Sequence, residues 1–248
     1  MSSKSGRSSD QAFVLHSRAY RNTSLIVDVL TREFGRLSMV AKGARQNKSP
    51  FYSVLQPFIP LYIGWGGNGE MPTLYTAEIH GAPDRLLNDE IYSGFYLNEL
   101  LIRLLHKHDP HPELFDAYKH CLKGIRQNVD VDISLRYFEI DLLEQLGYGI
   151  NLEFDAETGE QVRTESSYSY LLEHGPRLHK GLEDNHITVL GKTLLQMQDR
   201  NLTEPSTRKE AKFLLRLILD HYLGHKPLKT RELVRSRSKM NESTITND

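Results

Sequence analysis

Three short motifs contain residue types that handle phosphate or metal ions in other proteins. Residues 64–69 (GWGGNG) match the G-x-G-x-x-G string that holds pyrophosphate against a helix N-terminus. Residues 191–193 (GKT) resemble the end of a P-loop. His106, His108 and His111 are close enough in sequence to suggest a metal cluster. Each motif would imply a cofactor, a metal or an enzyme.

The sequence around each motif argues against that chemistry. Residues 73–75 (TLY) predict a strand after the glycines and therefore a hairpin turn, whereas a pyrophosphate fingerprint must open a helix. The P-loop has His186 where its first glycine is required, and the three histidines flank prolines without an i, i+4 pair. Cys121 is the only cysteine, which excludes an internal disulfide and a cysteine zinc cluster. We expect no catalytic residue, no metal and no cofactor.

Basic residues near the N-terminus suggest contacts with phosphates instead. The net charge is -1, but residues 1–80 carry nine Lys and Arg against five Asp and Glu, residues 81–204 twelve against twenty-two, and residues 205–248 ten against five. Basic blocks of this kind favour a polyanion-binding surface, although solubilising charges give the same pattern. The candidate residues for phosphate contact in a nucleic acid are Arg18, Arg21, Arg36, Lys42, Arg45 and Lys48, and the aromatic residues nearby, which would stack on bases or belong to the core, are Tyr20, Phe51 and Tyr52.

A second basic group has helical spacing. Lys209, Lys212 and Arg216 follow i, i+3, i+7 and share a helix face beside Phe213 and Leu217. Cations beside apolar positions on one helix face are suited to a short acidic peptide, although helix-surface cations are often only solvated.

The elements that position the first basic group are predicted to be strands. Short runs rich in Val, Ile, Leu, Tyr and Phe, separated by turn residues, predict five strands at residues 13–16, 25–30, 36–42, 58–65 and 73–78. In the third strand Leu37, Met39 and Ala41 alternate with Arg36 and Lys42, which predicts a half-exposed basic sheet. Five strands favour an OB-fold barrel at residues 1–80, with an SH3-like barrel as the alternative.

From residue 83 onward the hydrophobic period is helical. Helices are expected over residues 86–105, 114–125, 132–146, 188–199 and 207–223, with Gly147 and Gly224 as C-terminal caps. The 248 residues therefore predict an α+β chain with a helical domain at residues 81–235, an irregular insertion at about 151–183 and a polar tail at 236–248. With no apolar run of transmembrane length and no secretory signal pattern, we expect no membrane partner and a cytoplasmic location.

Several segments resemble one family in its order along the chain. They are residues 12–18 (AFVLHSR), 24–29 (SLIVDV), 34–36 (FGR), 40–45 (VAKGAR), 55–58 (LQPF), 96–101 (YLNELL), 146–149 (LGYG) and 226–233 (KPLKTREL). Together they are similar to the RecO family of bacterial recombination mediators, most closely its gammaproteobacterial, zinc-free type. Some relatives have four zinc-binding cysteines in the helical half, where this chain has the cysteine-free residues 151–163, so zinc is not implied.

The resemblance implies a non-enzymatic DNA repair protein with an OB-fold and a helical domain. It implies binding to single- and double-stranded DNA, strand annealing at the nucleoid, binding of the acidic tail of single-stranded DNA-binding protein (SSB), and loading of RecA together with RecR. RecF is a further candidate partner. The match of residues 135–139 (LRYFE) adds Arg136 to Lys209, Lys212 and Arg216 as candidate SSB-tail residues. Two alternatives stay open, a nucleotide-dependent enzyme that uses residues 191–193 or the glycine cluster at residues 64–69, and a pure protein adaptor.

Overall fold

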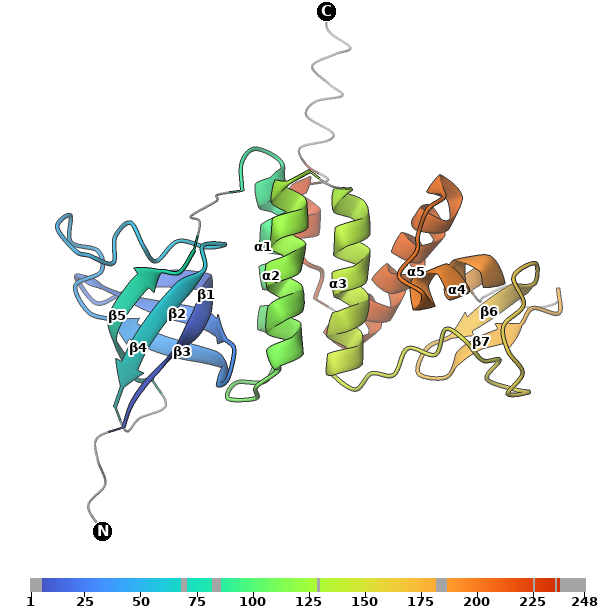
Figure 1. The fold of residues 1–248 in the computed structure, drawn as a ribbon, viewed down its shortest axis with the longest axis horizontal. Helices are drawn as coiled ribbons and strands as arrows, with labels where there is room; N and C mark the ends of the chain where they lie inside the picture. The colour runs from blue at the N-terminus through green and yellow to red at the C-terminus, as the bar shows by residue number, and fades with distance from the viewer. Residues whose placement is uncertain are drawn as a thin grey trace, which may run out of the picture. The chain divides into compact units, whose positions relative to one another are not determined.

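The computed structural model describes residues 6–67, 71–81, 86–128, 130–181, 187–224, 226–234 and 236. Their contacts divide the chain into two compact units, whose elements are shown in Figure 1. Unit 1 contains Met1–Gln127 and Leu228–Asp248, and unit 2 contains Asn128–Pro227. The expected polar tail lies outside the described residues, apart from Ser236.

Unit 1 begins with a closed barrel. Its strands are β1 (Arg7–Tyr20), β2 (Ser24–Thr31), β3 (Gly35–Ala41), β4 (Leu61–Gly66) and β5 (Thr73–Ile79). They follow the order β1-β2-β3-β5-β4, in which β1 also pairs with β4 and the β3–β5 pair is parallel. All five expected strands are present, and the prediction of an OB-fold barrel is confirmed.

The first strand is long enough to close the barrel. β1 pairs with β4 through its first half and with β2 through its second half, and its register shifts between Val14 and His16. Such a bulge bends a strand and increases its twist, which allows one strand to reach both neighbours. Ala12 and Val14 face the barrel core, whereas Phe13 contacts the rings of Phe115 and Tyr118 outside it. Both faces of β1 are therefore buried at this point.

Two helices pack against the barrel within unit 1. They are α1 (Glu90–Leu104) and α2 (Pro112–Arg126). Asn98 on α1 donates a hydrogen bond to the Leu15 carbonyl (2.8 Å) and accepts one from the buried Tyr118 hydroxyl (2.5 Å). This links β1, α1 and α2, so the barrel and these helices form one compact body. The expected domain boundary after residue 80 lies within that body and stays a prediction.

The chain returns to unit 1 near its C-terminus. Residues 229–234 are helical, and the Glu99 carboxylate accepts hydrogen bonds from the backbone N–H groups of Lys229 and Thr230, both at 2.9 Å. Burial raises the pKa of Glu99, but these hydrogen bonds and that of the Thr230 hydroxyl outweigh burial, so its pKa is lowered. A carboxylate at a helix N-terminus satisfies N–H groups that have no partner within the helix.

Unit 2 combines three helices with a small sheet. Its elements are α3 (Val131–Gln145), β6 (Ser167–Leu171), β7 (Gly175–Leu178), β8 (Ile187–Leu190), α4 (Gly191–Gln198) and α5 (Pro205–Leu223). Gly147 follows α3 with a positive φ of 73°, and Gly224 ends α5 with φ of 70°, as their roles as caps predict. The insertion is more regular than expected because β7, β6 and β8 form an antiparallel sheet. Residues 188–190 belong to β8 and not to the helix predicted there.

Candidate nucleic-acid interface

Five of the six candidate DNA-binding cations lie at one end of the barrel. Arg18 is in β1, Arg21 in the turn that leads to β2, Lys42 directly after β3, and Arg45 and Lys48 in the loop before β4. All five are exposed. We call residues 17–25 and 42–57 the basic end, because these 25 positions contain five Lys and Arg and no Asp or Glu. Such a surface attracts anions, because no carboxylate in these two segments neutralises its cations.

The loop of the basic end is hydrogen-bonded to the β1–β2 turn. The chain leaves β3 through Gly43, whose φ of 69° favours glycine, and the Arg45 N–H then donates to the Thr23 carbonyl at 2.9 Å. Arg45 Nη1 also contacts the carbonyl oxygens of Arg21 (3.4 Å) and Asn22 (3.3 Å). These contacts bring cations from two separate parts of the sequence together.

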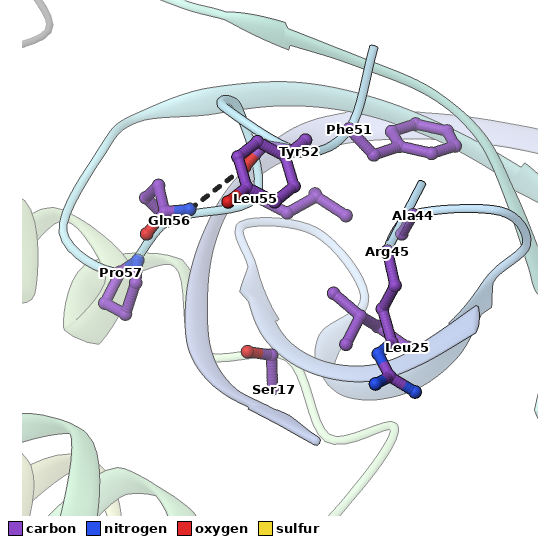
Figure 2. A pocket seen from close by; sticks show the side chains of 9 residues that line it. All are labelled: Ser17, Leu25, Ala44, Arg45, Phe51, Tyr52, Leu55, Gln56 and Pro57. Carbon is purple, nitrogen blue, oxygen red and sulfur yellow. Dashed lines mark hydrogen bonds between the residues drawn. The ribbon is translucent and has the colours of Figure 1, made fainter. Parts of the chain in front are cut away.

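A pocket opens within the basic end. It has a volume of about 270 Å³. Figure 2 shows Tyr52 and Leu55 of the loop on one side and Ser17 of β1 on the other, with Arg45 beside them. The remaining lining residues are Leu25, Ala44, Phe51, Gln56 and Pro57. Its wall therefore combines apolar side chains with polar ones, including one guanidinium and no carboxylate.

Arg36 is not part of the basic end. It lies near the start of β3, six positions before Lys42, and six strand residues span about 20 Å. Its Nη2 donates to the Leu105 carbonyl at 3.0 Å. Burial lowers the pKa of Arg36, although nearby Asp28 raises it. Ser38, on the same strand, is buried and hydrogen-bonded to Asp28, so the outer face of β3 is partly covered and Lys42 is the one of its two predicted cations that is exposed.

The three aromatic candidates differ in exposure. Phe51 belongs to the barrel core, Tyr20 is half-buried with the Arg21 guanidinium 5.1 Å from its ring, and Tyr52 is 61% exposed. Two further tyrosines, Tyr62 on β4 and Tyr75 on β5, are also exposed but were not among the aromatic residues predicted to stack on bases. Strand alternation could have found Tyr62, because its neighbours Leu61 and Ile63 are apolar and buried.

The second basic group lies on α5 in unit 2. Lys209, Lys212 and Arg216 are exposed, and Phe213 between them is 56% exposed. Lys212 Nζ lies 2.8 Å from Asp132 Oδ1 on α3, and Arg216 Nε lies 3.7 Å from Asp220 Oδ2. Exposed pairs of this kind contribute about 0–1 kcal/mol to stability, so both cations can exchange these partners for another anion. We call Lys209, Lys212, Phe213 and Arg216 the α5 face.

Comparisons with known proteins cover nearly the whole chain. The family model "Recombination protein O N terminal" matches residues 4–83, and "Recombination protein O C terminal" matches residues 89–232. The chain belongs to the RecO family. Proteins named DNA repair protein RecO are similar to it throughout: 46% identity to that of Methylococcus capsulatus (92% of this chain, 93% of the relative), 42% to that of Nitrosospira multiformis (94% and 96%) and 42% to that of Haemophilus influenzae (90% and 94%).

Arg136 differs from the other cations that the RecO resemblance suggested. It is 5% exposed, and its Nη2 lies 2.6 Å from Oε1 of Glu139, which is 1% exposed. A guanidinium buried against a carboxylate one helical turn away is not available at a rim. The structure therefore does not bring Arg136 to the exposed α5 face.

The cysteine-free segment at residues 151–163 is organised by a carboxylate. Asp155 Oδ1 accepts hydrogen bonds from the N–H groups of Glu157 (2.8 Å) and Thr158 (2.9 Å), and Oδ2 accepts one from Leu178 on β7 (2.7 Å). Burial raises the pKa of Asp155, but these N–H donors outweigh it and the pKa is lowered. Asp155 thus joins the turn at residues 155–158 to the sheet of unit 2.

The two glycine-containing motifs have structural roles in the parts of the chain described, which exclude residues 68–70 and with them part of the predicted hairpin turn. α4 begins at Gly191, which packs against the backbone of Arg163. A Cβ at position 191 would lie 2.0 Å from the Arg163 carbonyl oxygen, so only glycine fits there. Lys192 pairs with Glu204, and buried Thr193 donates to Glu210. Residues 64–66 are in β4, and the next described element is strand β5 and not a helix. Among the described residues no group of three His, Cys, Asp or Glu side chains is arranged for a metal, and no helix is long and apolar enough to cross a membrane.

Proposed function

We propose that this RecO-family chain is a non-enzymatic mediator of DNA repair and recombination. It binds single- and double-stranded DNA through the basic end and anneals complementary strands. With RecR and SSB it helps to load RecA, and RecF is a further candidate partner. It acts in the cytoplasm at the nucleoid.

The observation that supports DNA binding is the basic end itself. Five exposed cations lie on two hydrogen-bonded segments that carry no Asp or Glu. Such a surface neutralises phosphates without reading sequence, and it lowers the repulsion between two strands that must pair. In this mechanism no covalent bond is made or broken, so catalytic residues are not required.

The α5 face supports a second contact, with the acidic tail of SSB. Exposed Phe213 offers an apolar anchor, and Lys209, Lys212 and Arg216 offer charge-assisted hydrogen bonds. Attachment to this tail would concentrate the protein on SSB-coated DNA. The nucleotide-dependent enzyme is disfavoured because Lys192 and Thr193 are held by Glu204 and Glu210.

The experiment that tests the DNA-binding proposal is a titration of the full chain against labelled single-stranded DNA over a salt series. If about four to five phosphates are neutralised, log K should fall against log salt with a slope of about -3. An affinity that does not depend on salt would contradict the proposal and favour the adaptor alternative. ATP binding or turnover by the same sample would favour the enzyme.

A further inference from the structure

The pocket in the basic end has the chemistry of a site for a single nucleobase. We propose that it receives one unstacked base of single-stranded DNA while the cations around it hold the neighbouring phosphates. The proposal rests on DNA binding by the basic end and adds to it a contact with the base, which charge alone does not provide.

The wall of the pocket suits a flat aromatic ring. Leu25, Leu55 and Ala44 are apolar, and Phe51 and Tyr52 add two aromatic side chains. The 270 Å³ volume exceeds that of a nucleobase, and Tyr52 is 61% exposed, which leaves its ring accessible for stacking. Tyr52 is also positioned by its own loop, because Gln56 Nε2 donates to the Tyr52 carbonyl at 3.1 Å (Figure 2).

Polar groups at the pocket match the rest of a nucleotide. The Ser17 hydroxyl and the Gln56 amide can meet the polar edge of a base. Arg45 contacts the carbonyls of Arg21 and Asn22 through Nη1 alone and at long distances of 3.3–3.4 Å, so Nε and Nη2 are available for a phosphate. Arg18, Arg21, Lys42 and Lys48 lie on the same two segments. A slot with apolar and polar groups among cations therefore favours an anionic ligand over an apolar peptide, and an acidic peptide is the alternative that the test below addresses.

A base in the pocket would distinguish single from double strands. A base in a duplex must first be unpaired and unstacked, which costs a few kcal/mol, whereas a single strand offers its bases at little cost. The cations alone would favour the duplex, which has the higher charge density. The pocket would therefore add affinity for single strands alone, and the cations would add affinity for both forms.

The test compares Tyr52→Ala with Phe154→Ala, an exposed aromatic residue of unit 2 (45% exposed) outside the barrel. Each full-length protein is titrated with oligo-dT of about 20 nucleotides, with a base-free deoxyribose-phosphate polymer of equal length, and with a duplex. We expect Tyr52→Ala to weaken oligo-dT binding about tenfold, the effect of losing one stacked base, and to leave the other two affinities unchanged. Phe154→Ala should change none of them, and melting temperatures should match the wild type.

The possible failures can be distinguished. If the wild type binds none of the three polymers with a salt-dependent affinity, the DNA-binding proposal fails. If it binds oligo-dT and the base-free polymer equally well, or if Tyr52→Ala weakens both alike, DNA binding stands and the base pocket is wrong. An unchanged oligo-dT affinity in Tyr52→Ala would also contradict base binding by the pocket. The pocket would then bind another ligand, such as a peptide.

Discussion

Arg136 and Glu139 form a buried ion pair on α3, with Arg136 Nη2 2.6 Å from Glu139 Oε1. Removing one member of a buried pair leaves the other charge without compensation. We therefore expect Arg136→Ala to lower the free energy of unfolding by about 3–5 kcal/mol, measured by urea denaturation. Arg163→Ala is the control. Both side chains of the Arg163–Glu160 ion pair are exposed, so this pair should contribute less than about 1 kcal/mol to the free energy of unfolding. Unchanged stability together with loss of SSB-tail binding would restore Arg136 as a rim residue.

Reversing charge at the basic end should separate DNA binding from folding. Lys42 and Arg45 are exposed, so the double change Lys42→Glu with Arg45→Glu should leave the melting temperature nearly unchanged. Single-stranded DNA affinity should fall at least tenfold, and the salt slope should become shallower by about 1.4, the effect of losing two phosphate contacts. The matched control is Lys119→Glu with Lys123→Glu, two exposed lysines of α2. Equal losses in both double variants would show that only net charge matters.

The strands were predictable from sequence, but the cover on their outer faces was not. Period-two alternation and turn residues identified all five barrel strands, because they depend on neighbours along the chain. The role of Arg36 depends on the Leu105 carbonyl, 69 residues away, and alternation says nothing about such a partner. For this reason the pattern gave the inner face of β3 correctly but could not show that Arg36 on the outer face is half-buried.

The cations of the candidate site were predictable from the sequence, but their arrangement in space was not. The basic end requires Arg45 to meet Thr23, and the pocket requires the loop at residues 42–57 to fold back over Ser17 and Leu25. These contacts connect segments about twenty or more residues apart, and no local pattern encodes them. Likewise helical spacing placed Arg216 and Lys212 on one face correctly, but it could not show that Arg136 is buried.

Alanine substitutions on the α5 face should affect the peptide more than DNA. The double change Lys212→Ala with Arg216→Ala should weaken an SSB-tail peptide about tenfold or more, because charge-assisted hydrogen bonds contribute about 1.5–3 kcal/mol each before solvent screening. Single-stranded DNA, which the basic end binds in our proposal, should lose much less affinity. Lys180→Ala with Arg163→Ala removes two other exposed, ion-paired cations of unit 2 and should change neither affinity. A collapse of DNA affinity with intact peptide binding would assign the α5 face to DNA.

Releasing Lys212 provides a test in the opposite direction. Asp132→Asn removes the carboxylate 2.8 Å from Lys212 Nζ and leaves the lysine without that competitor. Peptide affinity should then rise two- to threefold, by analogy with the ~0.5 kcal/mol of a typical exposed pair. A decrease in affinity on titration with the same peptide would mean that Asp132 positions Lys212 for binding.

Asp155 should make unit 2 sensitive to acid and insensitive to chelators. Its pKa is lowered on folding, so the stability it contributes is fully present above the unfolded value of about 3.9 and is lost as the pH falls through the lower folded value. Asp155→Asn keeps an oxygen for Glu157 and Thr158 but turns an NH₂ group towards the Leu178 N–H, which should cost about 1–3 kcal/mol at pH 7. In urea titrations from pH 7 to pH 3, the difference between wild type and variant should shrink as the wild-type carboxylate is protonated. EDTA should leave the melting temperatures of both proteins unchanged. A lower melting temperature of the wild type in EDTA would show that a bound metal stabilises this turn.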